Sequence, residues 1–193
     1  MPSKFKFKHG FKADAERLSE RYREELGLSK FDPLDALLLA KHVAIPVVTI
    51  DEFNNDLPLT FLKTLRDTRK FHAMWMSNEE NDKFIIHNNY HSPKRQQSNL
   101  MHELAHVILK HNISQEAAQL CFLTGLHYFN VQQEQEAKFL GGCLQISRSG
   151  LLWAKKKNLS DHEISDYYNA SLEMVTYRLN ISGVLIQRKY SSY

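Results

Sequence analysis

The stretch that decides the fold is Ser98-Asn99-Leu100-Met101-His102-Glu103-Leu104-Ala105-His106-Val107-Ile108-Leu109-Lys110-His111. Its apolar residues recur at spacings of three and four, which predicts an amphipathic helix with one buried face. Ser98 or Asn99 is expected to cap the start of this helix. The helix would present two histidines, His102 and His106, on a face beside the buried one.

The H-E-x-x-H pattern in this helix predicts a zinc site and a general base. Residues four apart lie on one face of a helix, about 6 Å from each other, so His102 and His106 can bind one Zn²⁺ ion through ring nitrogens. Glu103 would lie beside the metal rather than on it, where it can accept a proton from water. A zinc ion that keeps one position open needs three protein ligands, so a third must come from elsewhere.

The third ligand is expected on a second helix, over residues 134–144, which carries two carboxylates. Glu134 and Glu136 project about 200° apart, so only one of them can face the zinc. Glu136 lies nearer the apolar side, whereas Glu134 continues into the small residues Ala137 and Gly141, which would let the two helices approach closely. This pattern leaves both carboxylates open as ligands, and the other one would be solvated or paired with a cation.

The chain also resembles a known family through three stretches: His102 to His106, Ile85 to Gln97, and Glu134 to Ser147. The family is that of the ImmA/IrrE metallo-endopeptidases, which residues 84–147 resemble closely and the rest of the chain more weakly. In that family the third ligand is the glutamate of an E-x-x-A-x-x-(F/L/W)-(A/G) helix, which implies Glu134 here. The resemblance further implies a zincin-like core and one Zn²⁺ ion per chain.

Composition favours an intracellular globular protein, and we expect a cytoplasmic location. The 193 residues are 42% hydrophobic and 24% charged, enough for one sizeable core and a small appended unit. No run of about 18 apolar residues is present, so no membrane span is expected. A net charge of +3 is too mild to imply nucleic acid by itself. Cys121 and Cys143 are expected to be reduced core residues rather than a disulfide.

The order of elements predicts an α+β fold with a small β-sheet beside the zinc helices. Helices are expected over residues 12–26, 33–43 and 57–69, a strand over 45–50, and a β-hairpin over 71–77 and 83–87. Asp32 and Pro33 would be the N-cap and the first residue of the second helix. We expect residues 1–150 to form the metallopeptidase-like domain and residues 151–193 to form an extension packed on it.

The C-terminal extension resembles a helix-turn-helix, with two short helices joined by a tight turn. Ser160 and Glu163 fit a capping box, Ser171 is a second N-cap candidate, and residues 184–188 would add a strand. Several basic residues favour DNA contact: Lys155, Lys156, Lys157, Arg178, Arg188 and Lys189. The second helix, however, carries Glu173 and only one arginine, so it would neutralise phosphates poorly. We therefore expect a structural or protein-docking role rather than direct DNA binding.

Three further residues have both a functional and a structural interpretation, and a fourth, His111, has only a structural one. His111 is five positions after His106, about 140° round the helix, and is expected to face solvent. His127 and Tyr128 lie between the two ligand helices, where a donor could stabilise an oxyanion, or they could serve in packing. Arg95 could contact a substrate or pair with a carboxylate, or it could be a solvated loop residue.

These observations predict a zinc-dependent endopeptidase. The family resemblance implies that the substrate is a helix-turn-helix transcriptional repressor, cut so that phage, mobile-element or stress genes are released. The alternative is a regulatory, antitoxin-like protein with a structural zinc site, which acts by sequestering a DNA-binding partner. Glu103 favours the enzyme, because a structural site has no use for a carboxylate beside an open metal position.

Overall fold

A computed structural model describes residues 6–78, 80, 82–112 and 130–185 of the chain. Within these residues the protein is mostly helical and contains one small sheet. The elements, in chain order, are α1 (Phe11–Glu25), α2 (Ala36–His42), β1 (Val47–Thr49), the 3-10 helix η1 (Ile50–Phe53), α3 (Leu59–Arg66), β2 (Ala73–Ser77), β3 (Lys83–His87), α4 (Pro93–Ile108), α6 (Val131–Gln145), α7 (Arg148–Lys156), α8 (Asp161–Tyr167) and α9 (Leu172–Ile181).

The sheet is mixed, with the strand order β1-β3-β2. β1 runs parallel to β3, and Val47 pairs with Ile85. β2 runs antiparallel to β3, and Trp75 pairs with the other side of Ile85. The predicted β-hairpin is therefore confirmed, and β2 is an outer strand whose second edge, here called its free edge, pairs with no strand among the described residues.

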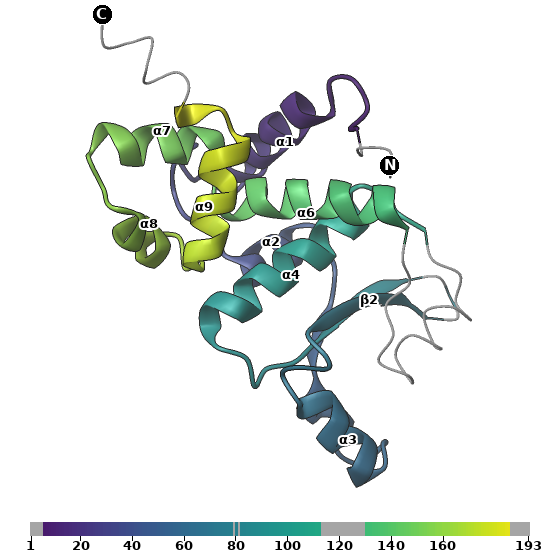
Figure 1. The fold of residues 1–193 in the computed structure, drawn as a ribbon. Coiled ribbons are helices and arrows are strands. Elements are labelled where there is room, and N and C mark those ends of the chain that lie inside the picture. Colours follow the sequence, from purple (N-terminus) through teal and green to yellow (C-terminus); the bar gives the residue numbers. More distant parts are fainter. Residues whose placement is uncertain (1–5, 79, 81, 113–129, 186–193) are drawn as a thin grey trace, which may run out of the picture.

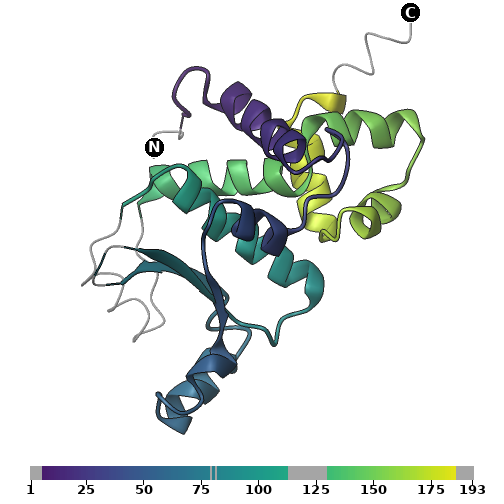
Figure 2. The same ribbon diagram turned by 180° about the vertical axis from the view of Figure 1, so that it is seen from behind.

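Helices α4 and α6 lie side by side through the middle of the molecule (Figure 1). The sheet lies on one side of this pair, and α3 extends beyond the sheet at one end of the molecule. α1, α7, α8 and α9 lie on the other side, as the view from behind also shows (Figure 2). The predicted zinc helices thus form the centre of the fold. None of the described helices is long and apolar enough to cross a membrane.

Both faces of the sheet are covered by hydrophobic residues. Because successive side chains of a strand point to opposite faces, Trp75 packs into the main core with α1, α2, α4 and α6, whereas Met74 and Met76 face η1 and α3. A third cluster joins the C-terminal helices and includes Ile146, Leu151, Ile164, Tyr168, Val175 and Leu179. The burial of both sheet faces explains why β2 carries four consecutive buried apolar residues, Ala73 to Met76, rather than an alternating pattern.

The C-terminal end of α6 is held by side chains from α1. The last carbonyls of a helix have no partner within it and need other donors. Ser19 Oγ donates to the carbonyl of Cys143 at 2.6 Å, and the Arg23 guanidinium donates to the carbonyl of Leu144 at 2.8 Å. A buried cation at this position also complements the negative end of the helix dipole. α6 is therefore fixed along its axis by α1.

Arg178 joins α9 to the same region. Its Nε donates to the carbonyl of Ile146 at 2.9 Å, and its Nη2 donates to Glu16 of α1 at 2.6 Å. The Arg178 side chain has no exposed surface. The C-terminal helices therefore pack firmly against α1 and α6, while the division into domains at residue 150 stays a prediction.

Two predicted helix starts are wrong. α2 begins at Ala36 with Asp35 as its N-cap, whereas Asp32 accepts a hydrogen bond from Ser29 N–H in a turn. Leu34 is buried and its carbonyl accepts from Gln97, which holds this segment extended until α2 begins. α4 begins at Pro93, after Ser92, rather than at the predicted Ser98 or Asn99. Ser92-Pro93 is the same N-cap and proline pattern that was assigned to Asp32-Pro33.

Other predicted elements have the right type but different lengths. The strand expected over residues 45–50 is the shorter β1 followed by η1, and the helix expected over 57–69 is the shorter α3. The capping box of Ser160 and Glu163 and the N-cap Ser171 are confirmed. Val184 and Leu185 are helical, so the strand predicted there is wrong at these two positions, and residues 186–188 lie outside the described residues.

Candidate metal centre

The three predicted zinc ligands lie together between α4 and α6. His102 and His106 come from adjacent turns of α4, and their Nε2 atoms are 3.2 Å apart. Glu134 comes from the first turn of α6, with its two carboxylate oxygens 3.3 Å from His102 Nε2 and 3.3 Å from His106 Nε2. Among the described residues these three form the one group of His, Cys, Asp or Glu side chains that could hold a metal ion.

The spacing of these donor atoms fits a tetrahedral zinc ion. Zinc bonds to histidine nitrogen and carboxylate oxygen of about 2.0–2.1 Å place neighbouring ligand atoms about 3.3–3.4 Å apart. The two histidine nitrogens are 3.2 Å apart, and each lies 3.3 Å from a different carboxylate oxygen of Glu134. Two neutral imidazoles and one carboxylate also match the ligand types that zinc takes in hydrolytic sites. A tetrahedral ion held by these three groups would keep its fourth position open.

Close contact between the two helices allows Glu134 to reach the histidines. Gly141 faces the backbone of α4, and a Cβ at this position would lie 3.0 Å from the carbonyl oxygen of Met101 and 3.2 Å from the nitrogen of His102. Ala137, one turn earlier, is fully buried. The small residues that followed Glu134 in the sequence therefore do lie where the helices meet.

Glu103 lies beside this group but contacts the sheet. Its Oε2 accepts a hydrogen bond of 3.0 Å from the backbone N–H of Trp75, on the free edge of β2. Burial raises the pKa of the Glu103 carboxyl, although the nearby His102 and His106 lower it in part. A carboxylate with raised proton affinity, held by one hydrogen bond, is suited to accept and return a proton.

The charges at the centre favour an ionised Glu134. Burial alone would raise the pKa of this carboxyl, but hydrogen bonds and charge from His102 and His106 hold the pKa well below its ordinary value. Burial alone would lower the pKa of His102, but the hydrogen bond to Glu134 and the charge of Glu103 raise it. A carboxylate that stays negative between two imidazoles provides the charge that a divalent cation needs.

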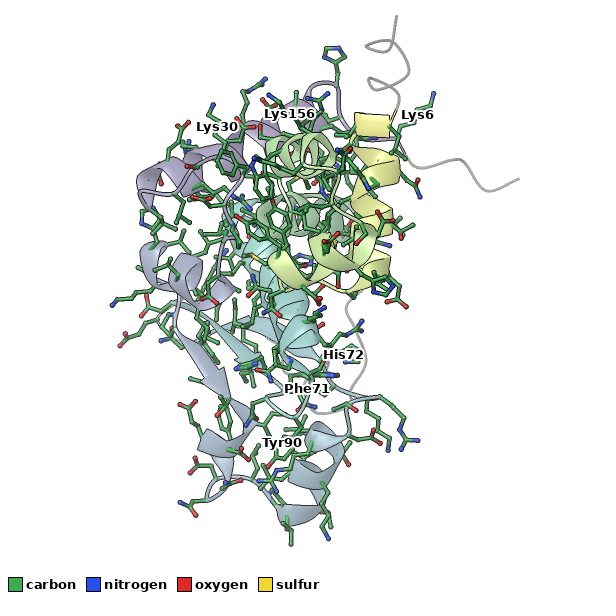
Figure 3. The ribbon with its side chains drawn as sticks, turned by 90° about the vertical axis from the view of Figure 1, so that its left-hand side faces the viewer. Lys6, Lys30, Phe71, His72, Tyr90 and Lys156 are labelled. Carbon is green, nitrogen blue, oxygen red and sulfur yellow. The ribbon has the colours of Figure 1, made fainter. Side chains whose placement is uncertain are left out.

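A cavity of about 800 Å³ opens beside the three candidate ligands and Glu103. One wall comes from β2 and the preceding His72, which lies between the upper helices and the α3 region (Figure 3). The opposite wall comes from α9, through Met174 and Tyr177, and from its N-cap Ser171. The candidate metal position therefore faces a space large enough for several side chains of a peptide.

Two cations line this cavity. Arg95, which precedes the ligands on α4, is among its lining residues and is exposed. Lys138 lies one turn after Glu134 on α6, and its Nζ is 5.1 Å from the centre of the Tyr177 ring. The spacing of four from Glu134 could have identified Lys138 from the sequence. The α9 wall had no local signal, because it depends on how the C-terminal helices pack.

The expectation that His111 faces solvent is wrong. The residue is 6% exposed, and its Nδ1 lies 3.0 Å from Nδ1 of His106. Its Nε2 lies 3.3 Å from Oε2 of Glu136. Glu136, the carboxylate that does not face the candidate metal position, therefore contacts a buried histidine rather than solvent or a lysine or arginine. Burial and the nearby His106 lower the pKa of His111, opposed by the contact with Glu136.

The end of α4 explains where His111 points. The helix ends at Ile108, and Lys110 adopts a left-handed conformation with φ of 56°. Lys110 N–H donates to the carbonyl of Val107, and His111 N–H donates to that of His106, each at 3.0 Å. This is the Schellman pattern of hydrogen bonds at a helix end. The chain folds back there, so the helical angle used to predict an exposed His111 does not apply.

Three predicted residues fall outside the described part of the chain. His127 and Tyr128, the candidates for oxyanion contact, lie there, and their roles stay predictions. Cys121 lies there as well, whereas Cys143 is a free cysteine buried in the core. Burial raises the pKa of the Cys143 thiol, which makes it a poor nucleophile.

Comparisons with known proteins support a family and a fold. No curated protein matches the chain. A solved structure of a Mycobacterium tuberculosis transcriptional regulator is similar over 87% of this chain and 46% of its own, with a TM-score of 0.53 and 16% sequence identity. This likeness concerns the fold alone, and the chain spans less than half of that protein's length. Residues 59–180 match the IrrE N-terminal-like domain, a peptidase family. The chain therefore belongs to the IrrE N-terminal-like domain family of metallopeptidases, as the sequence resemblance indicated.

Proposed function

We propose that this protein is a zinc-dependent endopeptidase. In this proposal His102, His106 and Glu134 hold the metal and Glu103 is the general base. The observation that supports it most directly is the group of His102, His106 and Glu134 beside the partly buried carboxylate of Glu103, with all four side chains lining one cavity. A structural zinc site would be closed by four protein ligands, whereas a catalytic site keeps one position open.

The chemistry would divide between the metal and Glu103. Bound zinc would act as a Lewis acid that polarises the scissile carbonyl and lowers the pKa of water toward about 7. Glu103 would accept a proton as water oxygen attacks the carbonyl carbon, and would return it to the amine nitrogen as the C–N bond breaks. The Trp75 N–H would hold one carboxylate oxygen during both transfers, which leaves the other free for the proton. We also propose that the core of this fold, with the two helices α4 and α6 that carry the candidate ligands, is zincin-like.

The substrate that we propose is a helix-turn-helix transcriptional repressor of a phage, a mobile element or a stress response. The support is the family resemblance, together with a cavity bounded by the free edge of β2 and by α9, which has room for a peptide segment. An interior loop or linker of a folded repressor would present such a segment. Cleavage there would separate DNA binding from dimer formation and so release the repressed genes.

Direct DNA binding receives little support from the helix-turn-helix-like pair α8 and α9. The single arginine of α9, Arg178, is buried against Glu16 and cannot reach a phosphate. Three other α9 residues face the metal cavity. Lys156, in the basic run of α7, lies at the far end of the molecule from His72 of the cavity wall (Figure 3). We therefore propose that these helices form part of the peptidase rather than a DNA-binding module.

The decisive experiment compares the parent protein with Glu103→Gln. A helix-turn-helix repressor bound to its operator DNA is incubated with each zinc-loaded protein, and cleavage on a gel is measured together with release of the DNA. The amide keeps the size of the side chain but cannot accept a proton, so we expect cleavage and release with the parent and a loss of about 10² or more in rate with the variant.

The second candidate function, sequestration without cleavage, predicts a different result. The parent and Glu103→Gln would then release the operator equally well, and the repressor would stay intact. Such an outcome would contradict the peptidase proposal. A Glu173→Gln variant is the matched control, because Glu173 also lines the cavity but is neither a candidate ligand nor the base.

A further inference from the structure

A continuous chain of polar contacts extends from His106 away from the metal position. The first link joins His106 Nδ1 to His111 Nδ1 over 3.0 Å, and the second joins His111 Nε2 to Glu136 Oε2 over 3.3 Å. The Gln132 side-chain amide donates to the other oxygen of Glu136 at 3.0 Å. His106, His111 and the Glu136 side chain are 7%, 6% and 13% exposed, so water competes little for these contacts.

If His106 binds zinc through Nε2, the protons in this chain can be assigned. A ligating nitrogen carries no proton, so neutral His106 is protonated on Nδ1 and donates from there. His111 Nδ1 must then accept, which places the proton of neutral His111 on Nε2. That proton points to the carboxylate of Glu136, which accepts it. Each nitrogen and oxygen in this series of contacts thus has a defined role as hydrogen-bond donor or acceptor.

We propose that His111 and Glu136 are positioning residues that fix the tautomer and ring orientation of His106 as a zinc ligand. This inference rests on the proposed function, since it takes the zinc site as given. Outer partners of this kind orient the imidazole and increase its basicity, and their loss commonly weakens metal binding by about 10–100-fold. His111 does not touch the metal position or the substrate cavity, so it acts only through His106.

The fold gives this contact its rigidity. The backbone N–H of His111 donates to the carbonyl of His106 at 3.0 Å, so His111 is bound to His106 by backbone and side chain together. Glu134 and Glu136 leave α6 about 200° apart. One carboxylate therefore meets the histidines on α4 and the other meets the turn that follows α4. Each of the two glutamates would have a separate task at the same centre.

The test measures zinc affinity of the full chain by competition with a chelator. His111→Leu removes the acceptor for His106 Nδ1, and we expect zinc affinity to fall by about 10–100-fold. In His111→Asn, the amide oxygen can occupy the place of Nδ1 and accept the same hydrogen bond, so this variant should recover most of the loss. Glu136→Leu should weaken binding less than His111→Leu. Gln135→Leu, on the exposed side of α6, should leave the zinc affinity unchanged.

A second measurement needs no substitution. Nitrogen-15 NMR of the zinc-loaded protein should show His106 protonated on Nδ1 and His111 protonated on Nε2, because a structural packing role alone would not fix both tautomers. A His111 protonated on Nδ1 would overturn the proposal even if the variants failed to fold. Unchanged zinc affinity in a folded His111→Leu would overturn it as well. If the parent protein bound no zinc, the proposed function and this inference would both be wrong.

Discussion

The backbone N–H of Trp75 donates a hydrogen bond of 3.0 Å to the carboxylate of Glu103, and this contact links the sheet to the candidate metal centre. Trp75 lies on β2, an outer strand of the described sheet, while Glu103 lies between two candidate ligands on α4. The Trp75 side chain is buried in the main core, so the strand cannot easily shift. The position of the proposed base is therefore set by the packing of the sheet against α4.

Shortening the proposed base tests this link. Glu103→Asp keeps the carboxylate but withdraws it by one methylene from both Trp75 N–H and the reacting atoms. A displacement of about 1 Å at a reacting group can cost 10²-fold in rate, and we expect a fall in kcat of about that size with zinc content unchanged. Steady-state kinetics and elemental analysis would measure both. Activity within threefold of the parent would show that the distance set by β2 does not matter.

Substitution of any of the three candidate ligands should lower the zinc content far more than substitution of a neighbouring residue. Glu134→Ala removes one of three donors and leaves two imidazoles, so we expect less than stoichiometric zinc under conditions that saturate the parent. His102→Ala and His106→Ala should act in the same way. Gln135→Ala is the control, because this side chain is exposed beside Glu134. Full zinc occupancy in Glu134→Ala, measured by elemental analysis after dialysis, would contradict the assignment of the third ligand.

The sequence predicted which candidate ligands share a helix face better than it predicted the residues around them, for a physical reason. His102, Glu103 and His106 lie within one regular helix, where spacing alone defines which residues share a face. The side chain of His111 could not be placed in this way, because the helix ends at Ile108 and a left-handed Lys110 reverses the chain. A lysine at that position carries no signal, whereas a glycine would have indicated the turn.

The secondary-structure elements also divide into those that the local sequence predicts and those that depend on residues far away in the sequence. The hairpin and the helix expected over residues 12–26 follow from local patterns, and both are confirmed, the helix as α1 with bounds Phe11–Glu25. The start of α2 depends instead on Gln97, sixty-one positions away, whose side chain binds the backbone at Leu34 and Ala36. The cavity wall contributed by α9 likewise depends on tertiary packing. Contacts between residues far apart in the sequence produce no periodic pattern from which they could be predicted.

Enlarging Gly141 should disturb the metal centre through the backbone. A methyl group there would meet the carbonyl of Met101 and the backbone of His102, so α4 or α6 must move by a few tenths of an ångström. We expect Gly141→Ala to lower the free energy of unfolding by about 1–3 kcal/mol and to weaken zinc binding. In the control, Gly142→Ala, the methyl group would meet the Arg178 side chain instead, so stability should fall while zinc affinity of the folded protein is kept. Equal zinc affinities in both variants would contradict this account.

Breaking the buried pair of Arg178 and Glu16 should destabilise the whole chain. Arg178→Met would remove the guanidinium donor from the Ile146 carbonyl and from Oε1 of Glu16, whose other oxygen would keep the Arg148 backbone N–H as a donor. Removal of one partner of a buried ion pair costs about 3–5 kcal/mol, and we expect chemical denaturation to show a loss in that range. The double variant with Glu16→Gln should recover part of it, because no buried charge remains unpaired. A loss below about 1 kcal/mol for Arg178→Met would show that α9 is not held by this pair.

Met174 tests whether α9 forms part of the substrate site. Its side chain lines the cavity opposite β2, whereas Leu172 on the same helix is exposed and is not a lining residue. Met174→Ala should widen the space beside the metal without touching a candidate ligand, so zinc content should stay the same. Because a few methylene-sized groups in a pocket change specificity by about tenfold or more, the ratio of kcat/KM between peptides with large and small apolar side chains at the cleavage site should rise in this variant. Leu172→Ala should leave the ratio unchanged, and equal ratios in all three proteins would place the substrate away from α9.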